Sequence, residues 1–201
     1  IETFIRDVIG YREYAHMLYL SSRNKLVNSN EWNHKRRMTD AWRAGETGVV
    51  PFDVLIKKVQ SHGYATTVER SQIAGMLMFL CEIFPADVNQ FFLELFIDGY
   101  EWATIPNVYG LSQCADGGKL VPILPIANSR MLIESGAYPK GEWTDIWDGL
   151  YIRFVQNNRT ELLKMSAMKS TVKHVDEMDA DRKRILGYRA EDFLTNFTVS
   201  E

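Results

Sequence analysis

The sequence predicts an all-α protein, and three observations support this fold class. Apolar residues recur at three- and four-residue spacing along most of the chain, which is typical of helices with one packed face. No segment shows the sustained alternation of a half-buried strand. Four of the six prolines and five of the thirteen glycines fall in one stretch, residues 103–142. At 201 residues the chain is long enough for a sizeable core, and we expect a single helical domain over residues 1–201.

The first expected helix spans residues 2–20, where apolar residues starting with Phe4, Ile5 and Val8 follow helical spacing. Residues 21–50 are polar and punctuated by Gly and Asn. We therefore expect them to be mostly loop, with short helical pieces.

The next apolar pattern predicts a short helix from Phe52 to His62. A further helix is expected to begin near Thr66 and to carry Ile73, Leu77 and Leu80 on one face.

Pro85 then stands where a helix can begin, since its missing N–H is not needed at the first position. An apolar stripe follows it, made of Val88, Phe91, Phe92, Leu95 and Phe96.

Residues 103–142 are expected to form a long irregular segment, because Gly and Pro are frequent there, among them Gly110, Gly117, Gly118, Pro122, Pro125 and Pro139. A loop of that length inside a compact domain is usually functional or ordered by a ligand. Helices are expected again over Trp143–Gln156, Arg159–Lys169 and Ala180–Leu194.

The net charge of −3 gives no overall electrostatic reason for binding nucleic acid. The charge is unevenly distributed, however. Residues 1–70 contain 11 Lys and Arg against 8 Asp and Glu, whereas residues 71–120 contain 1 against 6. The densest basic point, from His34 to Arg37, is either a solvated loop or part of a surface for DNA.

Two cysteines, Cys81 and Cys114, stand far apart and in no metal-binding spacing. They imply no disulfide framework, so we expect the cytoplasm or another reducing intracellular compartment. No apolar run is long enough to span a bilayer, and no secretory signal opens the chain, so no membrane partner is expected. Since the first residue is Ile1 and not Met, we expect a further segment before it.

Arg70 and Asp98 fall on the apolar faces of two successive expected helices. A charge in such a position is costly unless it is paired or bound to a polar ligand. Two interpretations follow. The two residues form a structural ion pair between the helices, or they bracket a polar ligand in the core.

Several motifs together resemble the C-terminal, FAD-binding domain of photolyases and cryptochromes. The longest are Phe4-Ile-Arg-Asp-Val-Ile-Gly-Tyr-Arg-Glu-Tyr14 and the segment from Phe96 to Gly118. Shorter matches are Gly45-Glu-Thr47, His62-Gly-Tyr-Ala65, Leu150-Tyr151, Glu177-Met-Asp179 and Phe193-Leu194. The branch that resembles this sequence most is the one of bacterial enzymes with an iron–sulfur cluster. The resemblance implies a bundle of helices, with the long irregular segment next to the flavin.

The resemblance also implies roles for individual residues. Cofactor contacts are implied for Arg12, Thr67, Arg70, Asp98, Thr104 and Asn107. Contacts with damaged DNA are implied for Tyr11 and Trp102. No catalytic residue and no metal ligand is assigned. The family's phosphate-binding loop and antenna domain precede the helix at which this chain starts, so a separate N-terminal chain or domain is expected to complete the flavin pocket.

The sequence departs from that branch at its cluster. Of the four cluster cysteines, the first is replaced by Pro51 and the last falls near Asp145. Cys81 and Cys114 match none of the four positions, and two thiolates cannot hold a four-thiolate cluster. We therefore expect no iron–sulfur cluster.

The family's electron-transfer and proton-transfer residues are also replaced. The Trp/Tyr chain that carries electrons to the flavin corresponds to Arg43, Phe91 and Phe92, which are not readily oxidised. The His pair of the (6-4) type corresponds to Thr66 and Thr67, which cannot act as general acids near neutral pH.

Two functional hypotheses remain open. In the first, the chain is a photolyase-like flavoprotein, a DNA-repair lyase that uses reduced FAD and light to split pyrimidine dimers in bound DNA. In the second, it is a non-catalytic scaffold or assembly module that has kept the fold and lost the flavin.

Overall fold

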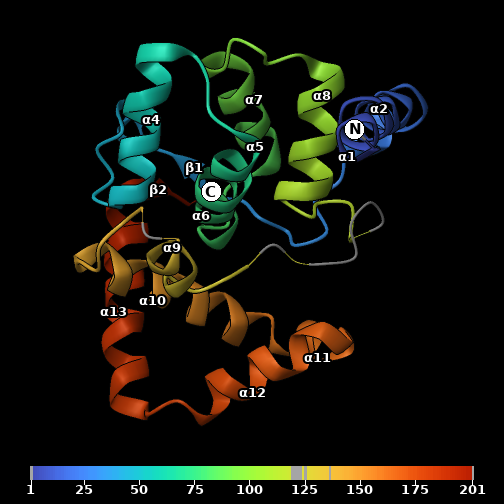
Figure 1. Ribbon diagram of the computed structural model, residues 1–201. Coiled ribbons are helices and arrows are strands. Elements are labelled where there is room, and N and C mark those ends of the chain that lie inside the picture. The colour runs from blue at the N-terminus through green and yellow to red at the C-terminus, as the bar shows by residue number, and fades with distance from the viewer. Residues whose placement is uncertain (1, 119–123, 125, 136, 201) are drawn as a thin grey trace. The chain divides into compact units, whose positions relative to one another are not determined.

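A computed structural model describes residues 2–118, 124, 126–135 and 137–200. The fold class is confirmed: the described residues are predominantly helical, and their strands are two residues long (Figure 1). They group into two compact units, residues 1–35 with 57–125 and residues 36–56 with 126–201. The single domain expected from the sequence stays a prediction. Pro122 and Pro125 of the expected irregular segment lie outside the described residues.

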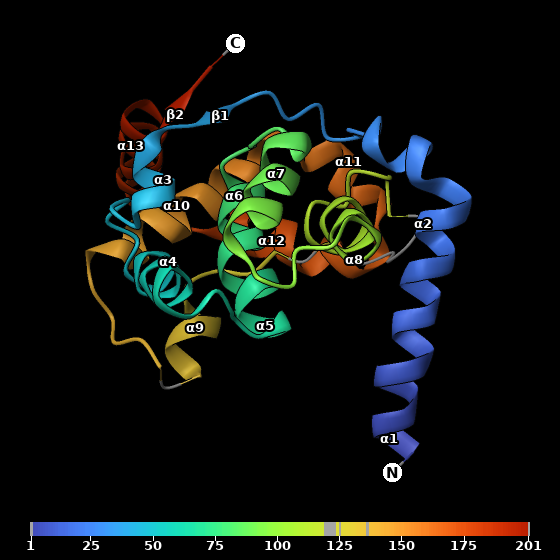
Figure 2. The same ribbon diagram turned by 90° about the horizontal axis from the view of Figure 1, so that it is seen from above.

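The first unit opens with one continuous helix, built from α1 (Glu2–Ile5), the π-helical segment η1 (Arg6–Tyr11) and α2 (Arg12–Val27) (Figure 2). The predicted helix over residues 2–20 is confirmed. The prediction of a loop from residue 21 was wrong as far as Val27. No Gly or Pro interrupts this stretch, and the burial of Leu26 supplies the packed contact that the polar residues lack.

A second continuous helix combines α5 (Thr67–Glu69), the π-helical η2 (Arg70–Gly75) and α6 (Met76–Leu80). It begins where the sequence predicted, because Thr66 caps it. The Thr66 hydroxyl accepts from the Glu69 N–H, and the Glu69 carboxylate accepts from the Thr66 N–H. Every side chain of α6 is buried, so this helix forms the centre of the unit.

Helix α7 (Pro85–Leu95) starts at the proline, as predicted. It ends at Leu95, so Asp98 lies in the turn that follows and not on the helix where the sequence placed it. The reason is local: the N–H of Gly99 bonds to the carbonyl of Phe96, which turns the chain immediately.

The prediction of an irregular segment over residues 103–142 was wrong for the first part of that range. Helix α8 (Glu101–Ile105) continues directly into the π-helical η3 (Pro106–Ser112), and α9 (Arg130–Glu134) forms further on. Pro106 stands at the first position of η3, where a proline does not interrupt the helix. Packing of α8 and η3 along α2 outweighs the weak helix propensity of Gly110.

The second unit contains α3 (Asp40–Ala44) and the first turns of α4 (Val50–His62), which agrees with the predicted Phe52–His62 helix. Its larger helices are α10 (Glu142–Asn157) and α13 (Ala180–Phe197), which pack closely on each other (Figure 1). Two strands unforeseen in the sequence, β1 (Arg37–Met38) and β2 (Thr198–Val199), pair antiparallel. They are too short to show alternation.

Between the two large helices, the predicted helix Arg159–Lys169 was wrong beyond Lys164. The structure has α11 (Arg159–Lys164), a 3-10 turn η4 (Ser166–Met168) and a separate α12 (Lys169–Glu177). The chain is extended at Met165, which separates the helices.

The basic run from His34 to Arg37 is not simply a solvated loop. His34 is buried, and its ring packs edge-on against Phe79 at 5.0 Å. Arg36 donates to the hydroxyls of Thr198 and Ser200. None of the described helices is long and apolar enough to cross a membrane.

Candidate functional site

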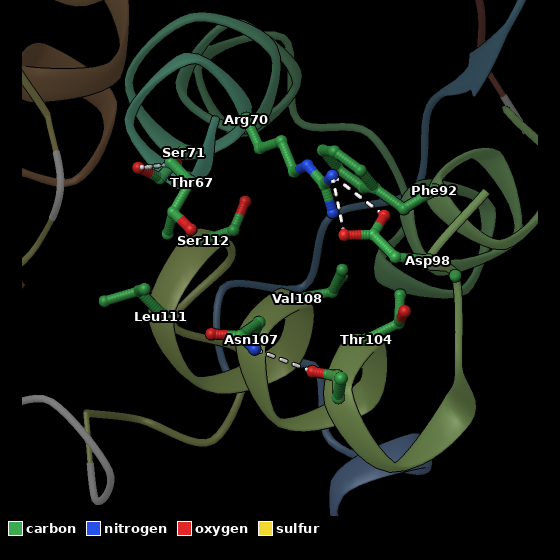
Figure 3. Close-up of a pocket in the computed structure, with 12 residues that line it drawn as sticks. Thr67, Arg70, Ser71, Phe92, Asp98, Thr104, Asn107, Val108, Leu111 and Ser112 are labelled. Atoms are coloured by element: carbon green, nitrogen blue, oxygen red, sulfur yellow. Dashed lines mark hydrogen bonds and ion pairs between the residues drawn. The ribbon is translucent and has the colours of Figure 1, made fainter. Parts of the chain in front are cut away.

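The first unit contains a pocket of about 230 Å³ (Figure 3). Its wall is formed by the start of the α5–η2 helix, the turn after α7, and the α8–η3 helix. The side chains drawn and labelled in the figure are Thr67, Arg70, Ser71, Phe92, Asp98, Thr104, Asn107, Val108, Leu111 and Ser112. Most are neutral, with hydroxyl groups beside apolar surface.

Arg70 and Asp98 form an ion pair in this wall, as one of the two interpretations of the sequence predicted. Nη2 of Arg70 lies 2.8 Å from Oδ1 of Asp98 and donates to Oδ2 at 3.0 Å. The side chains are 22% and 44% exposed, so the pair borders an open pocket and is not sealed in the core. Solvent screening therefore weakens the pair relative to a fully buried one.

The guanidinium of Arg70 is held on several sides. Its Nε donates to the carbonyl of Ala65 at 2.8 Å. Its central carbon lies 4.4 Å from the centre of the Phe96 ring and 5.2 Å from that of Tyr64. A cation between two aromatic faces is attracted to both, so Arg70 is fixed before any ligand arrives.

The Arg70–Asp98 pair does not use all of its hydrogen-bonding capacity. Within the described part of the chain, Nη1 of Arg70 has no hydrogen-bond partner. The Asp98 side chain is 44% exposed, but its Oδ1 is buried, lies 2.8 Å from Nη2 of Arg70 and has no hydrogen bond of acceptable geometry. A donor therefore stands beside a half-exposed carboxylate, which suits a ligand edge that carries a carbonyl next to an N–H.

On the opposite wall, Asn107 is engaged by the protein itself. Its Nδ2 donates to the carbonyl of Ala103 at 2.7 Å, and its Oδ1 accepts from the phenol of Tyr11 at 2.6 Å. Burial, and the nearby Tyr14, raise the pKa of Tyr11, so its phenol remains a donor. This bond joins the N-terminal helix to the pocket wall.

The pocket gathers five of the six residues for which the sequence implied cofactor contacts: Thr67, Arg70, Asp98, Thr104 and Asn107. The sixth, Arg12, is not in the wall. Its guanidinium lies 5.5 Å from the centre of the Trp102 ring, beside His16, in a separate hollow of about 110 Å³. The two residues implied in DNA contact lie on different helices. Tyr11 of η1 bonds to Asn107, and Trp102 of α8 lies under the guanidinium of Arg12.

Sequence reasoning missed a close approach of the two π-helical segments at the pocket. Gly75 of η2 faces Ser112 of η3 so closely that a Cβ on Gly75 would collide with the Ser112 hydroxyl. The side-chain Nε2 of Gln113 bonds to the carbonyl of Gly75 at 3.0 Å. The available signal was the glycine itself, since a glycine inside an apolar helical run often marks close packing.

No group of three or more His, Cys, Asp and Glu side chains is arranged to hold a metal within the described residues. Cys81 and Cys114 are buried thiols that form no disulfide. Burial and then the charge of Asp116 raise the pKa of the Cys114 thiol to about 12. A thiol that stays protonated is a poor metal ligand and a poor nucleophile.

The chain is thus a helical protein with a mostly neutral pocket flanked by an Arg–Asp pair. No known protein-family profile matches the chain. The chain is 29% identical over 204 residues to a (6-4) photolyase of Agrobacterium fabrum, covering 96% of this chain and 40% of the photolyase. This similarity, which extends over nearly the whole chain, supports a photolyase-like family.

Two uncharacterised proteins of Acanthamoeba polyphaga mimivirus are also similar. One is 37% identical over 82 residues, which is 40% of this chain and 67% of that protein. The other is 33% identical over 67 residues, which is 33% of this chain and 50% of that protein. The chain thus spans less than half the length of the photolyase that it matches.

Proposed function

We propose that this chain is the flavin-binding part of a photolyase-like protein, and that its pocket holds the isoalloxazine ring of FAD. The observation that carries the proposal is the gathering of five implied cofactor residues around one pocket, next to the Arg70–Asp98 pair. The similarity to a (6-4) photolyase supports the same conclusion.

The free hydrogen-bonding atoms of the wall fit such a ring. Arg70 would donate from Nη1 to a ring carbonyl, and the exposed part of the Asp98 carboxylate would accept from a ring N–H. Phe92 and Val108 offer apolar surface to the ring. Bound flavin would supply light-driven electron transfer, while Tyr11 and Trp102 would stack on bases of damaged DNA.

A whole dinucleotide needs more room than this pocket gives. Pockets that enclose ligands of drug size measure roughly 300–1,000 Å³, whereas this one measures about 230 Å³. We propose that a further domain or a separate chain encloses the rest of the cofactor. We also propose a relation to the iron–sulfur branch without its cluster, and a reducing intracellular location, which fits two cysteines that form no disulfide.

One observation favours the alternative, a non-catalytic scaffold. Thr66, which stands where relatives of the (6-4) type are expected to carry a histidine, has its hydroxyl committed to capping α5. This hydroxyl stabilises the fold, donates its own proton to the Glu69 carboxylate at 2.9 Å, and is too weak an acid to protonate a substrate near neutral pH. The same fold could therefore persist without repair chemistry.

The visible absorption and fluorescence of the purified chain, before and after addition of FAD, test the proposal. We expect FAD fluorescence to change on binding, and the change to weaken at least tenfold in Arg70→Leu and Asp98→Ala. Arg130→Leu is a matched control, since Arg130 forms an exposed ion pair with Glu134 in the other unit. A folded chain that neither carries nor takes up FAD would favour the scaffold. Repair is tested separately, by illumination of ultraviolet-damaged DNA, and DNA binding by mobility shift at low salt.

A further inference from the structure

We infer that the pocket recognises a flavin by its ring alone, so that FAD, FMN, riboflavin and lumiflavin bind this chain with similar affinity. The inference rests on the proposed function, and it concerns what part of the ligand this chain selects. It follows from the charges of the wall, from its helix ends and from its size.

The charges of the wall do not favour a phosphate. Arg70 is the single cation among the described residues that line the pocket, and Asp98 is the single anion. The two neutralise each other at 2.8 Å. A phosphate bound next to Arg70 would also lie near the Asp98 carboxylate and would be repelled by it. A neutral ring, by contrast, can use both partners.

The helix ends at the pocket do not offer a phosphate site either. At the start of α5, the Glu69 N–H is bonded to the Thr66 hydroxyl at 3.2 Å, and the Glu69 carboxylate occupies the Thr66 N–H at 2.8 Å. That carboxylate would also oppose an anion. At η3, Pro106 has no N–H and the helix runs on from α8 without a free end.

Three cations on helices near the pocket, Lys58, Arg23 and Arg12, are engaged elsewhere. Lys58 bonds to Glu69 at 2.7 Å, and Arg23 pairs with Glu101 at 3.2 Å. Arg12 stacks on Trp102. Recruiting any of them to a diphosphate would break an existing interaction, so a phosphate gains little from this chain.

The size of the pocket points to the same selection. A volume of about 230 Å³ accommodates a ring, with the ribityl chain leading outward, but not the adenylate as well. The Nη1 donor of Arg70 and the half-exposed Asp98 carboxylate also suit the ring and not the tail.

The test is a set of fluorescence and absorbance titrations of the full chain with FAD, FMN, riboflavin and lumiflavin, at low and at high salt. We expect the four dissociation constants to agree within about threefold and to change little with salt, because no phosphate contact is made. ADP in excess should not displace riboflavin. Asp98→Asn, which keeps the shape of the side chain, should weaken all four ligands by the same factor, and Arg130→Gln should weaken none.

Each other outcome is decisive. FAD binding tenfold or more tightly than riboflavin, or FMN affinity that falls with salt, would overturn ring-only recognition and leave the flavin pocket itself supported. Competition by ADP would do the same. Failure of all four ligands to bind the folded chain would overturn the flavin pocket, and ring-only recognition with it.

Discussion

Tyr64 lies over the guanidinium of Arg70, with 5.2 Å between the ring centre and the guanidinium carbon. Tyr64 is half exposed and is not part of the pocket wall, so it contacts the pocket only through Arg70. Phe96 covers the guanidinium at 4.4 Å. The position of the pocket's cation is therefore set partly by two aromatic residues that do not line the pocket.

Tyr64→Leu tests this arrangement. We expect the substitution to remove a partly exposed cation–π contact that stabilises the position of Arg70 by about 0.5–1 kcal/mol. Tyr64→Phe keeps an aromatic ring and should therefore keep this contact. The measurement is the NMR signal of the Arg70 Nε–H, which is bonded to Ala65 in the apo protein. In Tyr64→Leu its ring-current shift should shrink and its exchange should accelerate. Equal spectra for the Leu and Phe variants would show that Tyr64 does not hold Arg70.

Gly75→Ala tests the close approach of η2 and η3. The added Cβ would collide with the Ser112 hydroxyl and would lie 3.1 Å from the carbonyl of Arg70. Overpacking of this kind costs about 1–3 kcal/mol, and we expect that loss in denaturant unfolding.

Gly187→Ala is the matched control, since Gly187 lies inside α13 with nothing within 4 Å of its added Cβ. There the helix propensity of alanine should stabilise by roughly 0.5–1 kcal/mol. If Gly75→Ala behaves like the control, the two π-helical segments are not tightly packed.

How much of this site the sequence could reveal depends on the range of the interaction. Helix starts at Thr66 and Pro85 depend on neighbouring residues, and both were predicted. The Arg70–Asp98 ion pair was one of the two interpretations that the apolar stripes allowed. The stacking of Arg12 on Trp102 and the bond from Tyr11 to Asn107 could not be predicted, because each depends on how α2 lies along α8 and η3. The end of α7 at Leu95 was missed because a turn bond, and not the apolar pattern, stops the helix.

Thr66→Ala removes the cap of α5 and should destabilise the chain by about 1 kcal/mol. Burial opposes ionisation of Glu69, but its bonds to Lys58 and Thr66 prevail and lower its pKa. A lowered carboxyl pKa stabilises the fold above the unfolded pKa, and this contribution is lost as the pH falls through the folded pKa. The difference in the free energy of unfolding between wild type and Thr66→Ala, measured by urea unfolding, should therefore become smaller in acid. Thr195→Ala, inside α13, is the control. A difference that is the same at neutral and acid pH would show that Glu69 does not take part in the cap.

The buried ring of His34 should make stability depend on pH in a different range. Burial lowers its pKa from 6.5 to about 4, although the charge of Glu82 acts in the opposite direction. Between these values the unfolded chain binds a proton that the folded chain does not, so stability is complete above pH 6.5 and falls as the pH drops to about 4. The loss integrates to about 3 kcal/mol if His34 alone is responsible.

Urea unfolding at pH 7 and pH 5, combined with an NMR titration of the four histidine rings, checks this prediction. The ring of His34 should stay neutral at pH 5 while the folded chain weakens. His34→Phe should remove most of the difference in stability between the two pH values, because a phenyl ring of similar size has no proton to bind, and His174→Phe on the exposed face of α12 should leave it in place. If the His34 ring titrates near pH 6.5, the site is open to water, and the burial of the ring against Phe79 is not maintained in solution.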